Sequence, residues 1–314
     1  MEKLIVSSSP HIHSGASTRK IMLDVIIALL PATIASLVYF RERALLLIAI
    51  CVCTAVLSEF VFNLVCKKKQ TIGDLSAVIT GLLLALSLPA KTGIWQCVLG
   101  SVFAIIVVKC IFGGIGCNFA NPAVTARVML LASFGPIVGG GNHTAFQNVD
   151  VVGGATPLEA IKNGATDNLP TLLDMFLGNR GGAIGETCAL ALIIGGIYLV
   201  VRKVIHWQTP VVYIGTVFVL SFLLGGFDVT YATYQILAGG LVLGAIYMAT
   251  DYSTTPVNTL GKVVFAFGCA ILTVLFRYYS KMIESVSYAI LIMNILSPYI
   301  ERLCARRPFG KVGK

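Results

Sequence analysis

Charged residues are scarce in this sequence of 314 residues: Asp, Glu, Lys and Arg together make up 12% of it, against about 25% in ordinary soluble domains. Hydrophobic residues make up 57%, against roughly 45–50% in such domains. A chain with so little charge cannot cover a globular surface with polar side chains, which excludes an ordinary soluble protein. The composition indicates a membrane protein.

The sequence also lacks the usual patterns of metal, cluster and nucleotide sites. Its nine cysteines include no Cys-x-x-Cys pair and none lies within residues 139–183, so we interpret them as small buried apolar side chains. The glycine-rich stretch at 113–116 has no strand before it, as a nucleotide-binding loop would require. A cleavable signal is missing too, because the polar residues 1–20 contain no apolar core. The first apolar segment is therefore expected to be its own insertion signal.

Apolar runs of about 20 residues, long enough to cross a bilayer, make up most of the chain. Ten such runs can be marked. The predicted fold class is therefore an all-α polytopic membrane protein with about ten transmembrane helices. The predicted spans are 21–40, 44–65, 72–90, 94–112, 119–138, 184–201, 208–226, 234–250, 262–279 and 283–300.

The distribution of basic residues predicts the orientation of these spans, because cytoplasmic loops carry an excess of Lys and Arg. With the N-terminus inside, fifteen Lys and Arg residues lie on the cytoplasmic side and seven lie outside. Both termini are therefore expected in the cytoplasm, and the long polar loop at 139–183 outside. The formal net charge of +9 is explained by this topology in a lipid membrane, and no nucleic-acid partner is expected.

Two segments, "GLLLALSLPAKTG" at 81–93 and "GLVLGAIYMATDY" at 240–252, align without a gap at an offset of 159 residues. Ten spans then divide into two sets of five, and because five is odd the second set is inverted in the membrane, as in many transporters. Two similar helices rich in small residues are the alternative. The predicted segments are a cytoplasmic tail at 1–20, a first repeat at 21–138, the external loop at 139–183, a second repeat at 184–300 and a basic cytoplasmic tail at 301–314.

The external loop contains the segment "VDVVGGATPLEA". Thr156 is followed by Pro157 and Glu159, which is the pattern of a capped helix start. A cap alone does not explain the small residues at 153–155, which leave the hydroxyl open to another enzyme. A phosphate esterified to that hydroxyl would lie at a helix N-terminus, where free N–H groups favour negative charge.

The part of this segment that reads "DVVGGAT" resembles the flavinylation motif Asp-x-x-Ser-Gly-Ala-Thr, in which a flavin transferase joins FMN through its phosphate to the last threonine. Asp150, Gly154, Ala155 and Thr156 match the motif, and Gly153 stands where serine is usual. Three further segments resemble the membrane subunit shared by the Rnf complex and the sodium-pumping NADH:quinone reductase: "SPHIHSGASTRKIMLDVIIALLPA", "FGGIGCNFANPAVTARVML" and "MATDYSTTPVNTLGK". This resemblance to the RnfD/NqrB family covers essentially the whole chain. It favours RnfD, because only about twenty residues precede the first span.

The resemblance implies an electron-carrying membrane subunit of a redox-driven pump for Na⁺ or H⁺, in which ferredoxin oxidation is coupled to NAD reduction. It implies FMN bound covalently to Thr156 and riboflavin held noncovalently within the spans. The implied partners are a flavin transferase, a second covalent-FMN subunit, and the iron–sulfur and NAD-binding subunits. The implied location is the cytoplasmic (inner) membrane of a bacterium or archaeon. The alternatives are an NqrB-like subunit and, from another class, a non-redox channel with the five-plus-five plan of urea and ammonium channels.

Polar residues in or beside the spans are functional candidates, because charge is costly in a bilayer. Arg127 is predicted to lie in the fifth span, where it serves a cofactor or ion path or, alternatively, a structural ion pair. Asn118 and Asn121 precede that span and are candidates for hydrogen bonds to a flavin or within a turn.

Asp251 follows the eighth span in a segment rich in hydroxyl groups, "TDYSTTP". We predict that it lies on the ion path, together with Thr250 beside it and with Tyr247 one helical turn earlier as a gate. The alternative is that Asp251 or Ser253 is the N-cap of the next helix.

Overall fold

The computed structural model describes residues 17–139, 158, 161, 170–178, 180–280 and 284–305. All regular elements among these residues are helices, which confirms the predicted all-α class. In chain order they are α1 (Thr18–Val65), η1 (Ile72–Asp74), α2 (Ser76–Ser87), α3 (Ile94–Val102), η2 (Phe103–Cys110), α4 (Pro122–Val138), α6 (Leu172–Leu177), α7 (Ala189–Val201), α8 (Gln208–Leu224), α9 (Val229–Leu237), α10 (Leu241–Leu243), η3 (Gly244–Met248), α11 (Thr259–Tyr279) and α12 (Ser285–Leu303).

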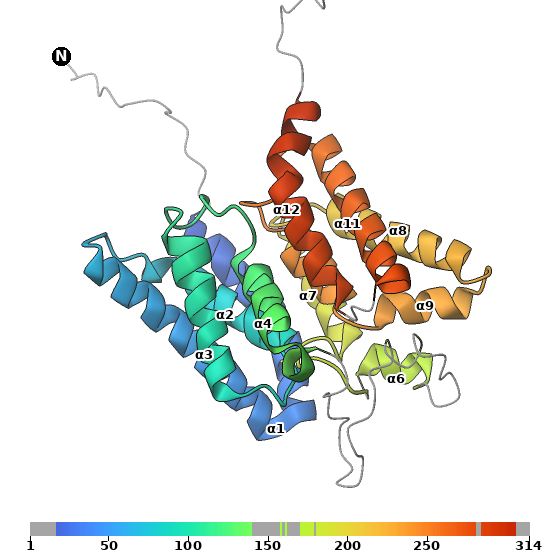
Figure 1. Cartoon of the computed structure of the whole chain (residues 1–314), viewed down its shortest axis with the longest axis horizontal. Helices are drawn as coiled ribbons and strands as arrows, with labels where there is room; N and C mark the ends of the chain where they lie inside the picture. Colours follow the sequence, from blue (N-terminus) through green and yellow to red (C-terminus); the bar gives the residue numbers. More distant parts are fainter. Residues whose placement is uncertain are drawn as a thin grey trace, which may run out of the picture.

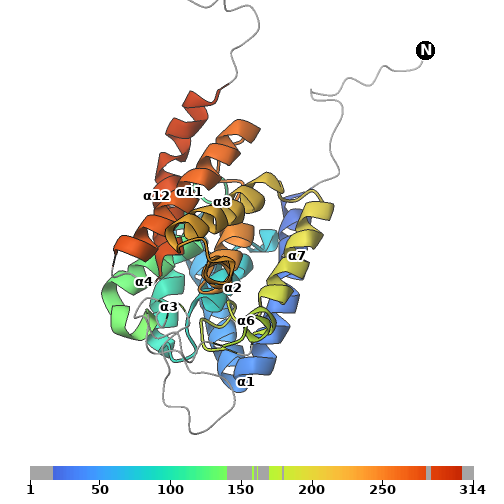
Figure 2. The same cartoon turned by 90° about the vertical axis from the view of Figure 1, so that its right-hand side faces the viewer.

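The first element, α1, consists of two helical arms that meet at Arg41. The backbone of Arg41 is non-helical, with φ 48° and ψ −130°, so the arms change direction there (Figure 1). The arms occupy the predicted spans 21–40 and 44–65. Both ends of the described chain leave the helix bundle from the same end (Figures 1 and 2), as expected if the termini share one side of the membrane.

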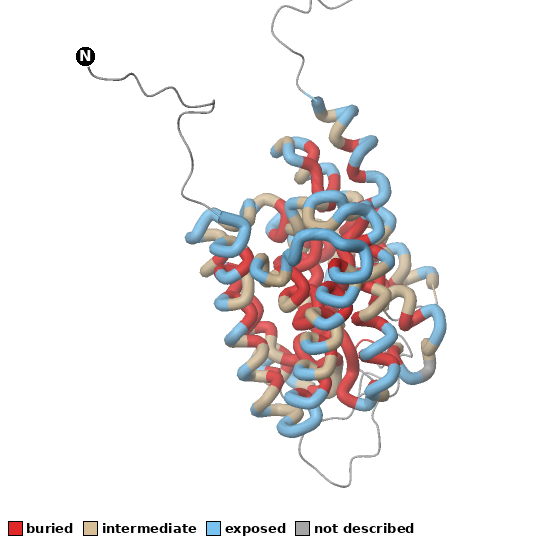
Figure 3. The backbone as a smooth tube through the Cα atoms, turned by 90° about the vertical axis from the view of Figure 1, so that its left-hand side faces the viewer, coloured by how far each residue is buried: buried red, intermediate tan, exposed pale blue. Residues whose placement is uncertain are grey.

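Large apolar side chains cover much of the outer surface. Exposed residues follow the outer faces of the helices (Figure 3), and they include Leu30, Ile34 and Val38 on α1. Soluble proteins rarely expose contiguous apolar patches of this kind. Among the described helices, α1 and α11 are long and apolar enough to cross a membrane, and a third span results if α9, α10 and η3 are counted together. The chain is therefore a multi-pass membrane protein, while the ten-span inverted repeat stays a prediction.

Two of the predicted spans are broken rather than continuous. The segment 72–90 contains the 12-residue helix α2, which ends just before Pro89, a residue without a backbone N–H. The segment 234–250 is divided at Gly239, whose φ is 69°, and the helices before and after the break make an angle of 66°. The sequence predicted one continuous span over 234–250, so the break at Gly239 corrects that expectation. The half-helices α2 and α10–η3 are almost entirely buried.

Three helices meet in a close contact around Gly195. A Cβ atom at this glycine of α7 would overlap both the Ala28 carbonyl of α1 and the Tyr247 hydroxyl of η3. The Tyr247 hydroxyl lies 3.1 Å from the carbonyl oxygen of Ala28 and 3.0 Å from that of Leu192, so it donates toward two helices at once. Small residues permit such close approach between membrane helices. The contact joins α1 of the predicted first repeat to α7 and η3 of the predicted second repeat.

The predicted topology can be tested at Asn168 in the long loop. In a variant without the accessible native cysteines, Asn168→Cys should react with a membrane-impermeant maleimide on intact cells, because the charge distribution predicts that this loop lies outside. Lys69→Cys is the matched control, since it lies in a short basic segment predicted to be cytoplasmic, and it should be labelled only after lysis. Labelling in the reverse pattern would overturn the predicted orientation.

Candidate functional site

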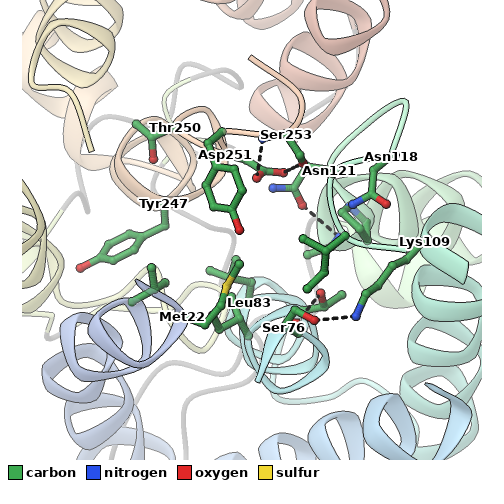
Figure 4. A pocket seen from close by; sticks show the side chains of 18 of the residues that line it. Met22, Ser76, Leu83, Lys109, Asn118, Asn121, Tyr247, Thr250, Asp251 and Ser253 are labelled. Atoms are coloured by element: carbon green, nitrogen blue, oxygen red, sulfur yellow. Dashed lines mark hydrogen bonds between the residues drawn. The ribbon is translucent and has the colours of Figure 1, made fainter. Parts of the chain in front are cut away.

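A pocket lies between the half-helices α2 and η3, close to the start of α1 (Figure 4). Its wall also includes parts of η2 and α7 and the loops before α4, before α8 and after η3. Apolar side chains form most of the wall, and a few polar groups converge on it, as is usual in sites for organic ligands. The apolar residues include Met22, Val25, Ile79, Leu83, Leu199 and Ile205, and the polar ones include Ser76, Lys109, Asn118, Asp251 and Tyr252.

Five of the residues predicted from the sequence line this pocket: Asn118, Asn121, Tyr247, Thr250 and Asp251. The fold thus brings together two segments that lie far apart in the sequence. The Oδ1 atom of Asn118 is buried and has no hydrogen-bond partner within the described part of the chain. Because an unpaired buried acceptor is costly, this oxygen suits a ligand that donates a hydrogen bond.

Asn121 has a structural role that the sequence left open. Its Oδ1 atom accepts hydrogen bonds from the backbone N–H groups of Ala123 (3.0 Å) and Val124 (3.3 Å), so it is the N-cap of α4. Its Nδ2 atom donates to the carbonyl oxygen of Met248 at 3.4 Å. Asn121 therefore holds the start of α4 against the end of η3, and the turn interpretation of this residue describes its contacts in the structure.

Asp251 closes a turn at the rim of the pocket. Its carboxylate accepts hydrogen bonds from the Ser253 backbone N–H (3.3 Å) and hydroxyl (3.1 Å) and from the Thr254 hydroxyl (3.3 Å). The next α-helix, α11, has its N-cap at Asn258, so the suggested N-cap at Asp251 or Ser253 is wrong: these hydrogen bonds close a turn. Burial raises the pKa of Asp251 above its ordinary value, and the hydrogen bonds from Ser253 and Thr254 oppose that rise.

Tyr247 and Thr250 both use their hydroxyl groups on backbone carbonyls. The Tyr247 hydroxyl contacts α1 and α7, as described above, and it points away from Asp251 in Figure 4. The Thr250 hydroxyl donates to the Ile246 carbonyl oxygen at 2.6 Å. The geometry thus gives Tyr247 a role in holding helices together, and its predicted role as a gate stays untested.

A buried ion pair beside the pocket was not among the predicted site residues. Lys109 donates to the Glu59 carboxylate at 2.8 Å and to the Ser76 hydroxyl at 2.6 Å. The side chains of Lys109 and Glu59 are only 3% and 2% exposed. The sequence signal was present, because both charges lie near the ends of apolar runs, but Glu59 reads equally well as an interfacial residue.

Arg127 lies apart from the pocket and makes the ion pair that was one of its two predicted roles. Its Nη2 atom is 3.0 Å from Glu186 and 2.5 Å from Glu284. Two further buried arginines lie close by: Arg180 donates to the Glu186 carbonyl oxygen at 2.7 Å, and Arg277 is buried near both carboxylates. We call this group the arginine cluster; it consists of Arg127, Arg180, Arg277, Glu186 and Glu284.

The arginine cluster surrounds the helix break at Gly239. Arg277 donates to the carbonyl oxygens of Gln235 and Ala238, which lie at the C-terminal end of α9 and would otherwise lack partners. A Cβ atom at Gly239 would lie 3.5 Å from Arg277 Nη2 and 3.4 Å from Leu158 Cδ2. Leu158 is buried against the same part of the chain, so this one residue lies close to the cluster.

The motif itself, Asp150, Gly154, Ala155 and Thr156, lies outside the described residues. Two residues that follow it, Leu158 and Ile161, are described and are helical. Within the described part of the chain no group of three or more His, Cys, Asp or Glu side chains could hold a metal ion.

The helical fold of the described residues, the apolar outer surface and the internal pocket define an integral membrane protein with a candidate ligand pocket. Comparison with known proteins is more specific: residues 5–310 match the NQR2, RnfD, RnfE family, and the chain belongs to this family. The family predicted from the sequence is thereby confirmed.

Three relatives, each the corresponding subunit of a larger complex, illustrate the similarity. The first belongs to the Na(+)-translocating ferredoxin:NAD(+) oxidoreductase complex of Acetobacterium woodii and is 45% identical over 310 residues, covering 98% of this chain and 95% of that protein. The second belongs to the proton-translocating ferredoxin:NAD(+) oxidoreductase complex of Clostridium ljungdahlii and is 39% identical over 316 residues, covering 97% and 96%. The third belongs to the ion-translocating oxidoreductase complex of Stutzerimonas stutzeri and is 35% identical over 329 residues, covering 94% and 93%.

Proposed function

We propose that this chain is the RnfD-type membrane subunit of an Rnf complex, a translocase that couples ferredoxin oxidation to NAD reduction and moves an ion across the membrane. The observation that carries the proposal is the family match over residues 5–310, together with relatives that are each named as the same subunit of an ion-translocating complex. Within such a complex the chain carries electrons between partner subunits. The two most similar of these relatives are named for different ions, Na⁺ and the proton, so similarity alone does not select the ion.

Riboflavin is the ligand we propose for the pocket. Its ring system has an apolar edge, which suits Met22, Leu83 and Ile205, and a polar edge with hydrogen-bond donors and acceptors. The unpaired Oδ1 atom of Asn118 fits a ring N–H donor, and the Lys109 ammonium group fits a ring acceptor. When bound, the flavin supplies reversible electron transfer, and the chain supplies its binding and its insulation from water.

The second flavin we propose is FMN joined to Thr156 through its phosphate. Leu158 and Ile161, which follow Thr156 in the sequence, are helical, as expected for a helix that starts after Thr156. The arginine cluster beneath Leu158 contains three guanidinium groups and two carboxylates, and the Nε atoms of Arg127 and Arg180 have no partner within the described residues. This excess of positive charge fits the single negative charge of a phosphodiester.

The proposed partners are the other subunits of the complex: a second subunit with covalent FMN, and subunits that hold iron–sulfur clusters and NAD. A flavin transferase is the partner in maturation. The proposed location is the cytoplasmic (inner) membrane, with both termini inside. The relatives described above favour the Rnf-type complex over the NADH:quinone reductase, and family membership favours either redox complex over a urea- or ammonium-type channel.

Purification of the intact complex tests the proposed function. A complex containing this chain should reduce NAD with electrons from reduced ferredoxin, and in vesicles this reaction should form an ion gradient. Comparing the rate with and without Na⁺ identifies the ion. Failure to oxidise ferredoxin, with all subunits and flavins present, would overturn the Rnf assignment.

Asp251 provides a test of ion coupling. Asp251→Ala should retain assembly and flavin content but lose most of the ion gradient formed per electron, because a half-buried carboxylate on the path would bind Na⁺ or pass a proton. The raised pKa of Asp251 means that its proton is held to a higher pH than in an ordinary aspartate. Thr255→Val is a control, since its hydroxyl donates only to the Asp251 backbone (2.7 Å). A mutant at Asp251 that pumps normally at saturating and limiting Na⁺ would show that this residue is structural.

A further inference from the structure

A chain of hydrogen-bonding groups connects the pocket to the protein surface. Thr71 lies in the exposed segment before η1, and its hydroxyl donates to Glu59 Oε1 at 2.5 Å. The other carboxylate oxygen of Glu59 accepts from Lys109 Nζ at 2.8 Å, and Lys109 lines the pocket. Asn63 donates to Thr71 at 3.1 Å and fixes the position of its hydroxyl. Each step is within hydrogen-bond distance, from the surface to the pocket wall.

Lys109 has one N–H donor left over at the pocket. An ammonium group carries three donors, and the structure assigns two of them, to Glu59 and to Ser76. Ser76 also lines the pocket, and Figure 4 shows the Lys109 side chain pointing to Ser76. The remaining N–H is therefore available to a ligand in the pocket.

We propose that Thr71, Glu59 and Lys109 form a proton path that supplies the ligand of this pocket when it is reduced. The inference rests on the proposed function to the extent that the pocket holds a flavin, which takes up protons together with electrons. It assigns to Glu59 and Lys109 a role in proton transfer to the pocket that is separate from ion binding at Asp251.

The transfer balances as follows. Electrons reach the pocket from reduced ferredoxin through the partner subunits. A Lys109 N–H bond breaks as an N–H bond forms on the ligand, which leaves the lysine neutral. Glu59 takes a proton from water by way of the Thr71 hydroxyl and passes it to the Lys109 nitrogen, which restores the original charges of both residues. The net change is one proton moved from water to the ligand for each N–H bond formed there.

The position of the pair distinguishes this role from simple ion pairing. An ion pair needs only its two partners, whereas here the pair continues to an exposed hydroxyl on one side and to the pocket on the other. Titratable groups near this pair include Cys110, Cys66 and Lys68, none of which lines the pocket. Asp251, Tyr247 and Tyr252 line the pocket together with Lys109, but within the described part of the chain none of them is hydrogen-bonded to the pair.

The test follows the absorbance of the pocket flavin during rapid reduction of the purified complex. Two altered proteins are compared with the unaltered complex. Thr71→Val removes only the surface hydroxyl. The double variant Glu59→Gln with Lys109→Met removes one negative and one positive charge and so leaves the net charge unchanged. Thr71→Val should retain noncovalent flavin, and the double variant should retain it when riboflavin is supplied in excess, because Lys109 is also a proposed contact of the flavin. In both proteins formation of the protonated reduced flavin should slow by roughly a hundredfold, which is within the usual contribution of a positioned acid. A small weak acid such as acetic acid, added at increasing concentration, should restore the rate, and a merely structural pair would not respond to it.

Asp24→Asn is the matched control, because Asp24 is also buried and paired, with Arg202 at 3.2 Å and Tyr198 at 3.0 Å, but does not line the pocket. It should leave the rate and its pH dependence unchanged. Normal rates in both altered proteins with flavin retained would overturn the proton path and leave the proposed function intact. Absence of noncovalent flavin from the unaltered complex would overturn both, and it is recognised before any variant is made.

Discussion

Replacing Thr156 with alanine should remove all covalent flavin from the protein. After denaturing electrophoresis the unaltered chain should fluoresce under ultraviolet light, and the Thr156→Ala chain should not, because the phosphoester has lost its only attachment oxygen. The altered protein should still reach the membrane, since loss of a helix cap costs only about 1 kcal/mol. Immunoblotting of the membrane fraction measures how much of the altered protein reaches the membrane.

The loop supplies its own matched control for this experiment. Thr166 follows Gly164 and Ala165 just as Thr156 follows Gly154 and Ala155, but no aspartate stands six residues before Thr166. Thr166→Ala should therefore keep full fluorescence. A fluorescent band that survives Thr156→Ala and disappears in Thr166→Ala would move the attachment to the second threonine.

Replacing Arg127 with leucine should destabilise the protein by about 3–5 kcal/mol, because it leaves buried carboxylates without a partner. The side chains of Arg127 and Glu186 are each 3% exposed, and that of Glu284 is 12% exposed. Thermal unfolding in detergent should show the loss, even in a Thr156→Ala background that carries no covalent flavin. Measuring the unfolding temperature in that background separates the contribution of the ion pair to stability from any effect of Arg127 on flavin attachment.

Two comparisons make this result specific. Adding Glu284→Gln to Arg127→Leu should recover part of the lost stability, because it removes one of the stranded charges. Arg202→Gln should have little effect, since the Arg202 side chain is 55% exposed and water replaces its interactions. If Arg127→Leu unfolds at the same temperature as the unaltered protein, the ion pair does not stabilise this fold.

The fold could be predicted from the sequence wherever one long apolar run forms one helix. The run at 262–279 corresponds to α11, and the two runs at 21–40 and 44–65 correspond to the arms of α1. Prediction failed at 234–250 because the run is apolar throughout, and its direction changes at a single backbone angle, the positive φ of Gly239. Hydrophobicity records burial in a membrane and carries little information about such a local change.

The sequence predicted which segments contribute residues to the pocket, but it did not predict which side chains contact one another. Asn118 and Asp251 were chosen as polar residues at helix ends, and both line the pocket. Arg127 was predicted because a charge inside a span is costly, yet its partners Glu186 and Glu284 come from distant parts of the chain. The pairing of Lys109 with Glu59 could not be predicted either, because it depends on how η2 packs against α1. Sequence patterns identify costly buried charges, whereas only packing decides which charges meet.

The close contact at Gly195 bears on how an ion could cross this protein. Carriers built from inverted repeats commonly expose their site to each side in turn by rocking one half against the other. Such a motion here would pull the Tyr247 hydroxyl away from the carbonyl oxygens of Ala28 and Leu192 and leave this buried donor unpaired, at a cost of about 1–3 kcal/mol. The contact therefore opposes a separation of α1 from α7 and η3. Any change in access to the pocket is then expected to come from the loops and side chains around it rather than from a separation of these three helices.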